Sequence, residues 1–283
     1  MKSLDDFTRL LIRMALLGGL ALVAPACSQQ EEVEPKLNSS AENSVKSDKT
    51  KTFYGPAVPM GQGVGRAWVM ANAAGNPTSI GVEVSAKSVF RQGDEPIEYT
   101  FQLPKQVPVP PFDHIELGWN PNGHEPEGIY TSPHFDLHFY MITSAFQATI
   151  PFLAPPAFDA PVPSQYFPSS PPSKYFMTPG LVPNMGAHLV DLLSPEFQPG
   201  GTFTKTFIYG SYQGNITFLE PMFTLEYLRA LATGAQTIET AAIPQPAAFQ
   251  RAGYYPTSYT ISYDNTPKQY TISLNNLLYH PAH

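Results

Sequence analysis

The chain has little of what several function classes need. It contains a single cysteine, Cys27, so no internal disulfide can form. Only 14% of the residues are charged, and the formal net charge is −7. An acidic chain without a basic stripe lacks the electrostatic footprint of a nucleic-acid-binding protein. We therefore expect no nucleic acid among its partners.

Two common motifs are also missing. The stretch Tyr209–Gly214 comes close to a Gly-x-Ser-x-Gly nucleophile elbow but lacks its pattern. The glycine-rich stretch Gly61–Gly65 leads into a predicted strand, whereas a phosphate-binding loop would lead into a helix. A carbohydrate-binding module would need exposed aromatic residues, but the only two tryptophans, Trp68 and Trp119, both fall in predicted strands.

The first residues have the three parts of an export signal. Lys2, Arg9 and Arg13 supply positive charge, Met14–Val23 is apolar, and Ala24–Ala26 supplies small residues at the cleavage positions. The apolar run is shorter than the ~20 residues that span a bilayer. The pattern predicts a cleavable signal peptide over residues 1–26, and a buried N-terminal helix is the alternative.

Cys27 directly follows these small residues, as in a bacterial lipoprotein, where the thiol carries a lipid. Lipidation would also remove a lone thiol from an oxidising compartment. We therefore expect a protein of the cell envelope, anchored to the membrane through Cys27 outside the cytoplasm. An ordinary signal peptidase would instead release a secreted or periplasmic soluble protein, and that alternative stays open.

The rest of the chain predicts a tether and one domain. Residues 27–52 are polar and poor in large apolar residues, so they predict a disordered tether that follows the lipidated Cys27. Residues 53–283 predict a single β-rich domain. Alternation of apolar and polar residues predicts strands or hairpins at 65–84, 99–103, 114–119, 133–141, 203–219 and 259–274. Short helices are expected at 144–153 and 222–232, which together indicate an antiparallel barrel or sandwich.

Residues 151–183 contain ten prolines. They predict a long irregular insertion that runs over the surface. A segment of this length without regular structure is uncommon in a compact domain and is often functional. This insertion could therefore give the protein a ligand or partner of its own, although the sequence does not specify which small molecule would bind.

The strongest chemical signal is the alternation in His134–Tyr140. In a strand, His134, Asp136 and His138 lie on one side, and the apolar residues between them lie on the other. Neighbours two apart are separated by ~6.8 Å, which suits two ligands of one ion, whereas the outer two histidines are ~13 Å apart. Either Asp136 pairs with one histidine, or a bulge brings the two histidines together.

Further ligands would have to come from other segments: His188, Glu220, and His124 in the preceding loop. Imidazoles with a carboxylate suit zinc, iron, manganese or nickel. The sequence therefore predicts one site for one divalent transition metal. Two alternatives stay open: a structural network in which these residues fix the strands, and an acid–base site without metal.

Several blocks resemble a bacterial domain family of unknown function, whose prototype is a stress-regulated protein of a thermophilic bacterium. The blocks are Trp119–Pro126, Pro133–Tyr140, Ser194–Phe197, Phe207–Gly214 and Glu220–Met222. The resemblance covers roughly residues 53–227. It implies a β-rich fold and self-association as a homo-oligomer, but it supplies no reaction. The matching positions in this chain are His124, His134, Asp136, His138, His188 and Glu220.

Two functions are compatible with these patterns. The first is an exported lipoprotein with a divalent-metal site in a β-barrel-like domain, acting as a metal-dependent hydrolase or cupin-like enzyme whose open coordination position activates water or substrate. The second is a non-catalytic envelope protein for binding or stress protection, in which the histidine and carboxylate cluster is structural.

Overall fold

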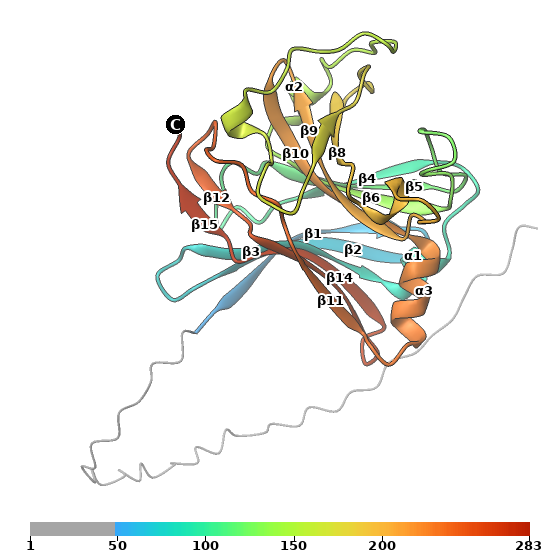
Figure 1. The fold of residues 1–283 in the computed structure, drawn as a ribbon. Helices are drawn as coiled ribbons and strands as arrows, with labels where there is room; N and C mark the ends of the chain where they lie inside the picture. Colours follow the sequence, from blue (N-terminus) through green and yellow to red (C-terminus); the bar gives the residue numbers. More distant parts are fainter. Residues whose placement is uncertain (1–48) are drawn as a thin grey trace, which may run out of the picture. The chain divides into compact units, whose positions relative to one another are not determined.

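The computed structural model describes residues 49–283 (Figure 1). The predicted signal peptide, Cys27 and most of the predicted tether lie outside the described residues. The first strand, β1 (Lys51–Met60), begins two residues before the predicted start of the domain. Among residues 49–283, no helix combines the length and the apolar character that crossing a membrane requires.

Two antiparallel sheets form the fold. The first has the order β1–β2–β3–β14–β13–β11, and the second has the order β4–β5–β6–β10–β9–β8–β7. The first sheet contains β1, β2 (Gly63–Ala71), β3 (Pro77–Ser85), β11 (Ile238–Ala242), β13 (Ser258–Asp264) and β14 (Gln269–Asn275). The second contains β4 (Ile97–Gln102), β5 (His114–Asn120), β6 (His134–Tyr140), β7 (Tyr175–Met177), β8 (Ala187–Asp191), β9 (Lys205–Tyr212) and β10 (Asn215–Thr224). A separate two-stranded sheet pairs β12 (Gly253–Tyr255) with β15 (Leu278–His280).

The main core lies between the two large sheets, because its buried side chains come from both (Figure 1). At one edge the sheets approach closely: a Cβ on Gly55 of β1 would lie 2.1 Å from the carbonyl oxygen of Gln102 in β4. Only glycine fits there. The sheets nevertheless do not close into a barrel. The predicted mainly-β antiparallel fold is confirmed, and of its two forms the structure is the sandwich and not the barrel.

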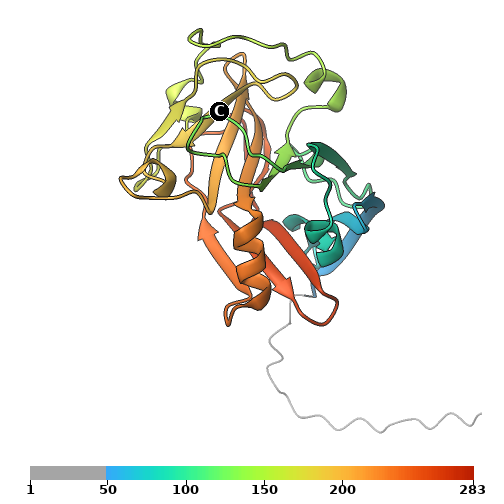
Figure 2. The same cartoon turned by 90° about the vertical axis from the view of Figure 1, so that its right-hand side faces the viewer.

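Local predictions agree with the structure except at element ends. β9 and β10 form the hairpin predicted within residues 203–219, and its turn consists of Gln213 and Gly214, both with positive φ (52° and 73°). The predicted helix at 222–232 begins later, as α3 (Leu225–Thr233), because Met222 continues β10 with its side chain buried. α3 lies beside β10 and β13 (Figure 2). The other helices are α1 (Ala86–Phe90) and α2 (Ser144–Gln147), the latter shorter than predicted.

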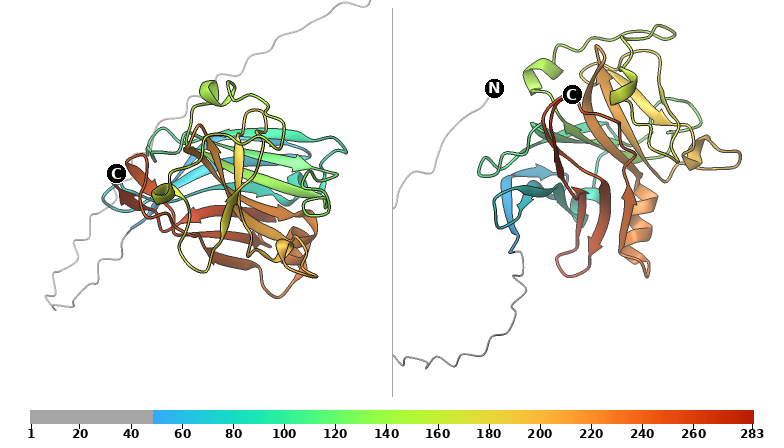
Figure 3. Two further views of the ribbon diagram at one scale, coloured as in Figure 1. Left: turned by 45° about the horizontal axis from the view of Figure 1, so that its top comes forward. Right: turned by 60° about the vertical axis from the view of Figure 1, so that its left-hand side comes forward.

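The proline-rich segment 151–183 is largely irregular, as predicted, but it is not only a surface loop. It contains a 3-10 turn at Ser164–Tyr166, and it supplies β7, which pairs with β8 as the edge strand of the second sheet. The segment, coloured yellow-green in Figure 3, is not confined to one side of the second sheet: Val162 belongs to the main core, and Tyr166 and Met177 pack against that core. The insertion therefore belongs to the architecture of the second sheet.

All seven residues of β6 are buried. Phe135, Leu137 and Phe139 enter the main core, as the alternation predicted. The opposite side, which we call the outer face of the second sheet, is covered by loops and by two smaller apolar clusters. These clusters contain Tyr130, Val190, Phe203, Ile208 and Met222, and Tyr140, Ile142, Ile150 and Phe218. The polar residues of β6 are therefore enclosed on the outer face.

Candidate metal centre

The six predicted ligands form two groups of three on the outer face. His124, His134 and Asp136 form the first triad, and His138, His188 and Glu220 form the second triad. Within each triad, one ligand atom per residue lies within 4.8 Å of the others. The sequence predicted one shared site for all six residues, whereas the structure separates them into two sites that could each hold a metal ion.

The first triad is built by one strand and one loop. His134 and Asp136 lie two residues apart on β6, and His124 comes from the loop that connects β5 to β6. Gly123 makes the loop fold back: its φ is +66°, and a Cβ there would lie 2.2 Å from the carbonyl oxygen of Tyr130. The amide of His124 then donates to that same oxygen at 2.9 Å. The loop therefore returns the imidazole to the sheet.

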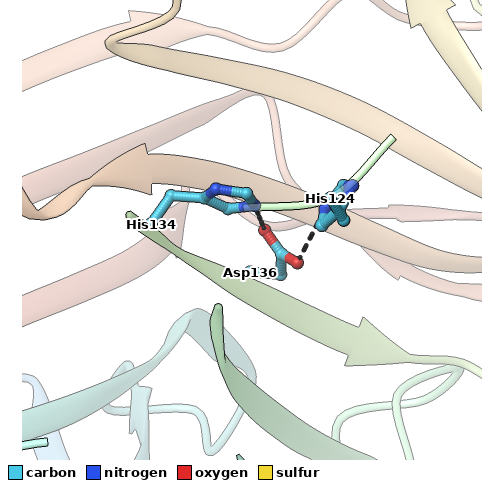
Figure 4. Close-up of side chains that lie close together, drawn as sticks. All are labelled: His124, His134 and Asp136. Atoms are coloured by element: carbon cyan, nitrogen blue, oxygen red, sulfur yellow. Dashed lines mark hydrogen bonds and ion pairs between the residues drawn. The ribbon is translucent and has the colours of Figure 1, made fainter. Parts of the chain in front are cut away.

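Asp136 faces both histidines of the first triad (Figure 4). Nε2 of His134 lies 3.1 Å from Oδ1 of Asp136, and Nε2 of His124 lies 3.2 Å from Oδ2. Asn120 of β5 donates to Oδ2 at 2.7 Å. The prediction that Asp136 pairs with a neighbouring histidine is confirmed. The side chain of His124 is 40% exposed and that of His134 is 0% exposed, so the triad opens to solvent on the His124 side.

The backbone determines which nitrogen of each histidine faces Asp136. Nδ1 of His134 lies 2.7 Å from the carbonyl oxygen of Ser132, and Nδ1 of His124 lies 2.6 Å from that of Glu125. A carbonyl can only accept, so each Nδ1 carries the hydrogen and donates it. In a neutral imidazole, Nε2 then carries a lone pair that faces an oxygen lone pair. A proton or a metal cation makes this contact favourable, and a donating Nδ1 is the usual support of a metal-bound histidine.

The two contacts with Asp136 differ in direction. The contact with His124 has hydrogen-bond geometry, so it can exist as an imidazolium–carboxylate pair. Nε2 of His134 and Oδ1 of Asp136 are equally close, but neither atom has a hydrogen-bond partner although both are buried. The 3.1 Å distance is short enough for a hydrogen bond, so it is the relative orientation of the two groups that prevents one. The Nε2 lone pair of His134 is therefore available to a third atom.

The carboxylate of Asp136 carries a negative charge within the first triad. Burial alone would raise the pKa of Asp136, but the hydrogen bond with His124 and the charge of the two imidazoles outweigh it and hold the pKa well below its usual range. Burial disfavours the charged form of His124, yet its hydrogen bond to Asp136 and the charge of that carboxylate raise the pKa of the imidazole. The carboxylate is thus ionised and attracts cations.

The second triad is assembled across three strands. Leu219 pairs with Phe139, and the same register places Glu220 of β10 opposite His138 of β6. Nε2 of His138 lies 3.3 Å from Oε1 of Glu220, and Nε2 of His188 on β8 lies 4.0 Å from Oε2. The side chains are 1%, 2% and 19% exposed for His138, Glu220 and His188 respectively. This triad is more enclosed than the first.

The polar atoms of the second triad are poorly satisfied. Neither ring nitrogen of His138 has a hydrogen-bond partner, nor does Oε2 of Glu220. Burial lowers the pKa of His138 to about 3. Burial, together with the charge of Asp136 and Glu98, raises the pKa of Glu220 well above its ordinary value. Burial therefore disfavours the charged form of both groups, and each buried group without a partner costs ~1–3 kcal/mol.

A proline interrupts the sheet beside the second triad. β10 pairs with β6 at Phe218 and Leu219 and again from Met222 to Thr224, but not at Glu220 and Pro221. Pro221 has no amide hydrogen to donate, which is why proline is rare in internal strands. His138 and Glu220 therefore face each other where the regular pairing of their strands is interrupted.

The carboxylates of the outer face lack basic partners. Across residues 49–283, the only ion pair that involves a lysine or arginine joins Lys205 to Glu239. Asp136 and Glu220 pair only with histidines. Positive charge on this face therefore has to come from protonated imidazoles or from a bound cation.

No protein-family model, curated protein or solved structure matches this chain. The resemblance to a bacterial domain family consequently stays a prediction. The case for function rests on the two triads themselves.

Sequence reasoning missed the polar residues of β5. His114, Glu116 and Asn120 alternate with apolar residues just as those of β6 do, and this signal could have placed them on the outer face. His114 is a structural histidine: Nδ1 lies 2.9 Å from Oδ1 of Asp113, and Nε2 lies 3.0 Å from Oε1 of Gln147. Both of its nitrogens are hydrogen-bonded, in contrast to those of His138.

Proposed function

We propose that this protein binds a divalent transition metal at the first triad. The ligands are Nε2 of His124, Nε2 of His134 and the carboxylate of Asp136, which Asn120 orients. The observation that carries the proposal is the contact of His134 with Asp136, at 3.1 Å without a hydrogen bond, while Nδ1 of His134 already donates to Ser132. Two imidazoles and one carboxylate suit zinc, iron, manganese or nickel.

The first triad supports binding better than it supports a particular reaction. Three protein ligands and an exposed His124 leave coordination positions for water, as in catalytic zinc sites. A substrate would also need a cleft beside the ion. A hollow of about 780 Å³ exists, but it is lined by residues of 103–113, 141–143, Phe146 and Arg251, and none of the six predicted ligands is among them. We therefore propose metal binding and assign no hydrolase or cupin-like reaction.

A structural network is the second candidate, because one observation favours it. Both nitrogens of His124 have acceptors in hydrogen-bond geometry, namely the carbonyl of Glu125 and the carboxylate of Asp136. A protonated His124 would neutralise Asp136 without a metal. This reading leaves the geometry of His134 unexplained, because Nε2 of that residue has no partner.

The test is metal content and affinity of the purified full-length protein. Purification without chelator and elemental analysis should find bound metal, and the chelated protein should take up Zn²⁺ again in a calorimetric titration. His134→Ala and Asp136→Asn should each abolish binding at the first triad. His114→Ala is the matched control, since His114 is buried on the same face but fully hydrogen-bonded.

Two results would count against the proposal. One is a pair of folded His134→Ala and Asp136→Asn variants, checked by circular dichroism, that bind as much Zn²⁺ as the unaltered chain. The other is an equal loss of metal in His114→Ala, which would show that any disturbance of the outer face expels the ion. In either case the structural network would be the better account of the first triad.

We also propose that the predicted signal peptide and Cys27 place this domain in the cell envelope, lipid-anchored outside the cytoplasm. The support is the pattern of small residues before Cys27. The polar residues that follow would let the domain stand away from the membrane surface.

A further inference from the structure

We propose that the second triad binds a second divalent metal ion, in an enclosed site that shares no ligand with the first. Its ligands are Nε2 of His138, Nε2 of His188 and the carboxylate of Glu220. This inference rests on the geometry of these three residues and stands whether or not the first triad binds metal.

The first argument is the lack of any other partner. His138 is 1% exposed and Glu220 is 2% exposed, so water cannot satisfy their polar atoms from the surface. A neutral imidazole has one donor and one acceptor, and His138 has a partner for neither. Oε2 of Glu220 is likewise without a partner. An ion bound between them would satisfy Nε2 of His138 and the carboxylate at once.

The second argument is distance. Two ligands bound at about 2.0 Å in a tetrahedral site lie about 3.3 Å apart. Nε2 of His138 and Oε1 of Glu220 are 3.3 Å apart, yet they form no hydrogen bond. Their spacing thus fits two ligands of one ion.

His188 completes the set from the outer part of the sheet. Its backbone is fixed on both sides by Thr178, whose amide donates to the carbonyl of His188 at 2.8 Å and whose Oγ1 accepts from the amide of His188 at 3.3 Å. Its ring packs edge-on against Phe218, which also contacts the ring of His138. Both imidazoles therefore contact the ring of Phe218, with Glu220 nearby.

The two triads are better described as two separate sites than as one two-metal centre. Asp136 and His138 are neighbours on one strand face, about 6.8 Å apart along the strand. The ions of a two-metal centre lie about 3.5–4 Å apart and share bridging groups. The sites also differ in access, because the first opens through His124 at 40% exposure, whereas the most exposed ligand of the second, His188, is 19% exposed.

The experiment measures how many ions bind and how fast each one dissociates. The full-length protein is stripped with a chelator and titrated with Co²⁺, followed by its visible absorption, and with Zn²⁺ in a calorimeter. Two equivalents should bind. When the loaded protein is mixed with excess chelator, one equivalent should leave at least tenfold faster than the other, because only the first triad opens to solvent.

Variants assign each ion to a triad. His138→Ala should retain one ion, which leaves fast, and His134→Ala should retain one ion, which leaves slowly. Glu220→Gln keeps the shape of the side chain and should behave like His138→Ala even if the alanine variant is unstable. The matched control His114→Ala should still bind two.

The outcomes separate the two proposals. If the unaltered chain binds one ion, and His138→Ala and Glu220→Gln still bind it, the second site does not exist and the first stands. If His134→Ala binds as much as the unaltered chain while Glu220→Gln binds none, the first site is refuted and the second stands. No binding by the unaltered chain refutes both.

Discussion

His138→Leu distinguishes a metal ligand from a structural histidine in the metal-free protein. His138 is 1% exposed, and neither ring nitrogen is hydrogen-bonded. Leucine has a similar volume and removes these unsatisfied groups, which should stabilise the metal-free protein by ~1–3 kcal/mol. The loss of ring contacts with Tyr140 and Phe218 should cost ~0.5–1.5 kcal/mol. The chelated variant should therefore range from unchanged to about 2 kcal/mol more stable.

His114→Leu is the matched substitution. The ring of Tyr140 stacks against both histidines, at 4.9 Å from His114 and 5.5 Å from His138. His114→Leu breaks two hydrogen bonds and leaves Oε1 of the buried Gln147 without its partner, so it should cost about 1–3 kcal/mol. The two variants start from similar surroundings and should move stability in opposite directions.

The assay is urea unfolding in the presence of chelator, followed by the fluorescence of the two buried tryptophans, Trp68 and Trp119. Thermal midpoints should agree, at about 2–4 °C per kcal/mol for a domain of this size. If His138→Leu destabilises the chelated protein as much as His114→Leu does, His138 supports the fold through bonds of its own. The argument for a second ion would then lose its basis.

Three further predictions concern acid, the loop and the anchor. In chelator, the free energy of unfolding should fall as the pH drops from about 6.5 to about 3, because the unfolded chain protonates His138 near 6.5 whereas burial holds its folded pKa at about 3. His138→Leu should flatten that part of the curve of stability against pH. An unchanged curve would contradict the view that His138 is buried without a charge. Gly123→Ala forces an alanine to φ +66° with its Cβ 2.2 Å from the carbonyl of Tyr130, and this backbone strain should cost about 1–2 kcal/mol. Calorimetry should therefore show roughly tenfold weaker Zn²⁺ binding at the first triad only. Equal affinity would show that the loop does not position His124. Cys27→Ser should move the protein from the membrane fraction to the soluble fraction on immunoblots, and retention in the membrane would rule out a lipid on that thiol.

Much of the fold could be predicted because strand alternation is a local signal. The apolar residues of β6 enter the core as expected, and the hairpins of β2 with β3 and of β13 with β14 lie at the predicted ranges 65–84 and 259–274. The predicted start of α3, at Met222, was wrong. Methionine suits either a helix or a strand, and the burial of Met222 on the sheet places it in the strand. The pairing of β7 with β8 could not be predicted, since three residues within a proline-rich segment give no reliable pattern.

The candidate site was predicted residue by residue but not in its arrangement. Alternation placed His134, Asp136 and His138 on one face correctly. It could not show that His188 would join His138 instead of His134, because that depends on the register of β8, β9 and β10. A long-range register is set by the whole sheet and is not written in any single segment.

The interruption of strand pairing at Glu220 and Pro221 affects how the second sheet would resist mechanical force. Internal strands of an antiparallel sheet are normally paired without a break, but the pairing of β6 with β10 is interrupted at Glu220 and Pro221. An ion held between His138 and Glu220 would join the two strands at that step through side chains. Coordination would then act as a cross-link, and the mechanical continuity of the sheet would depend on the supply of metal.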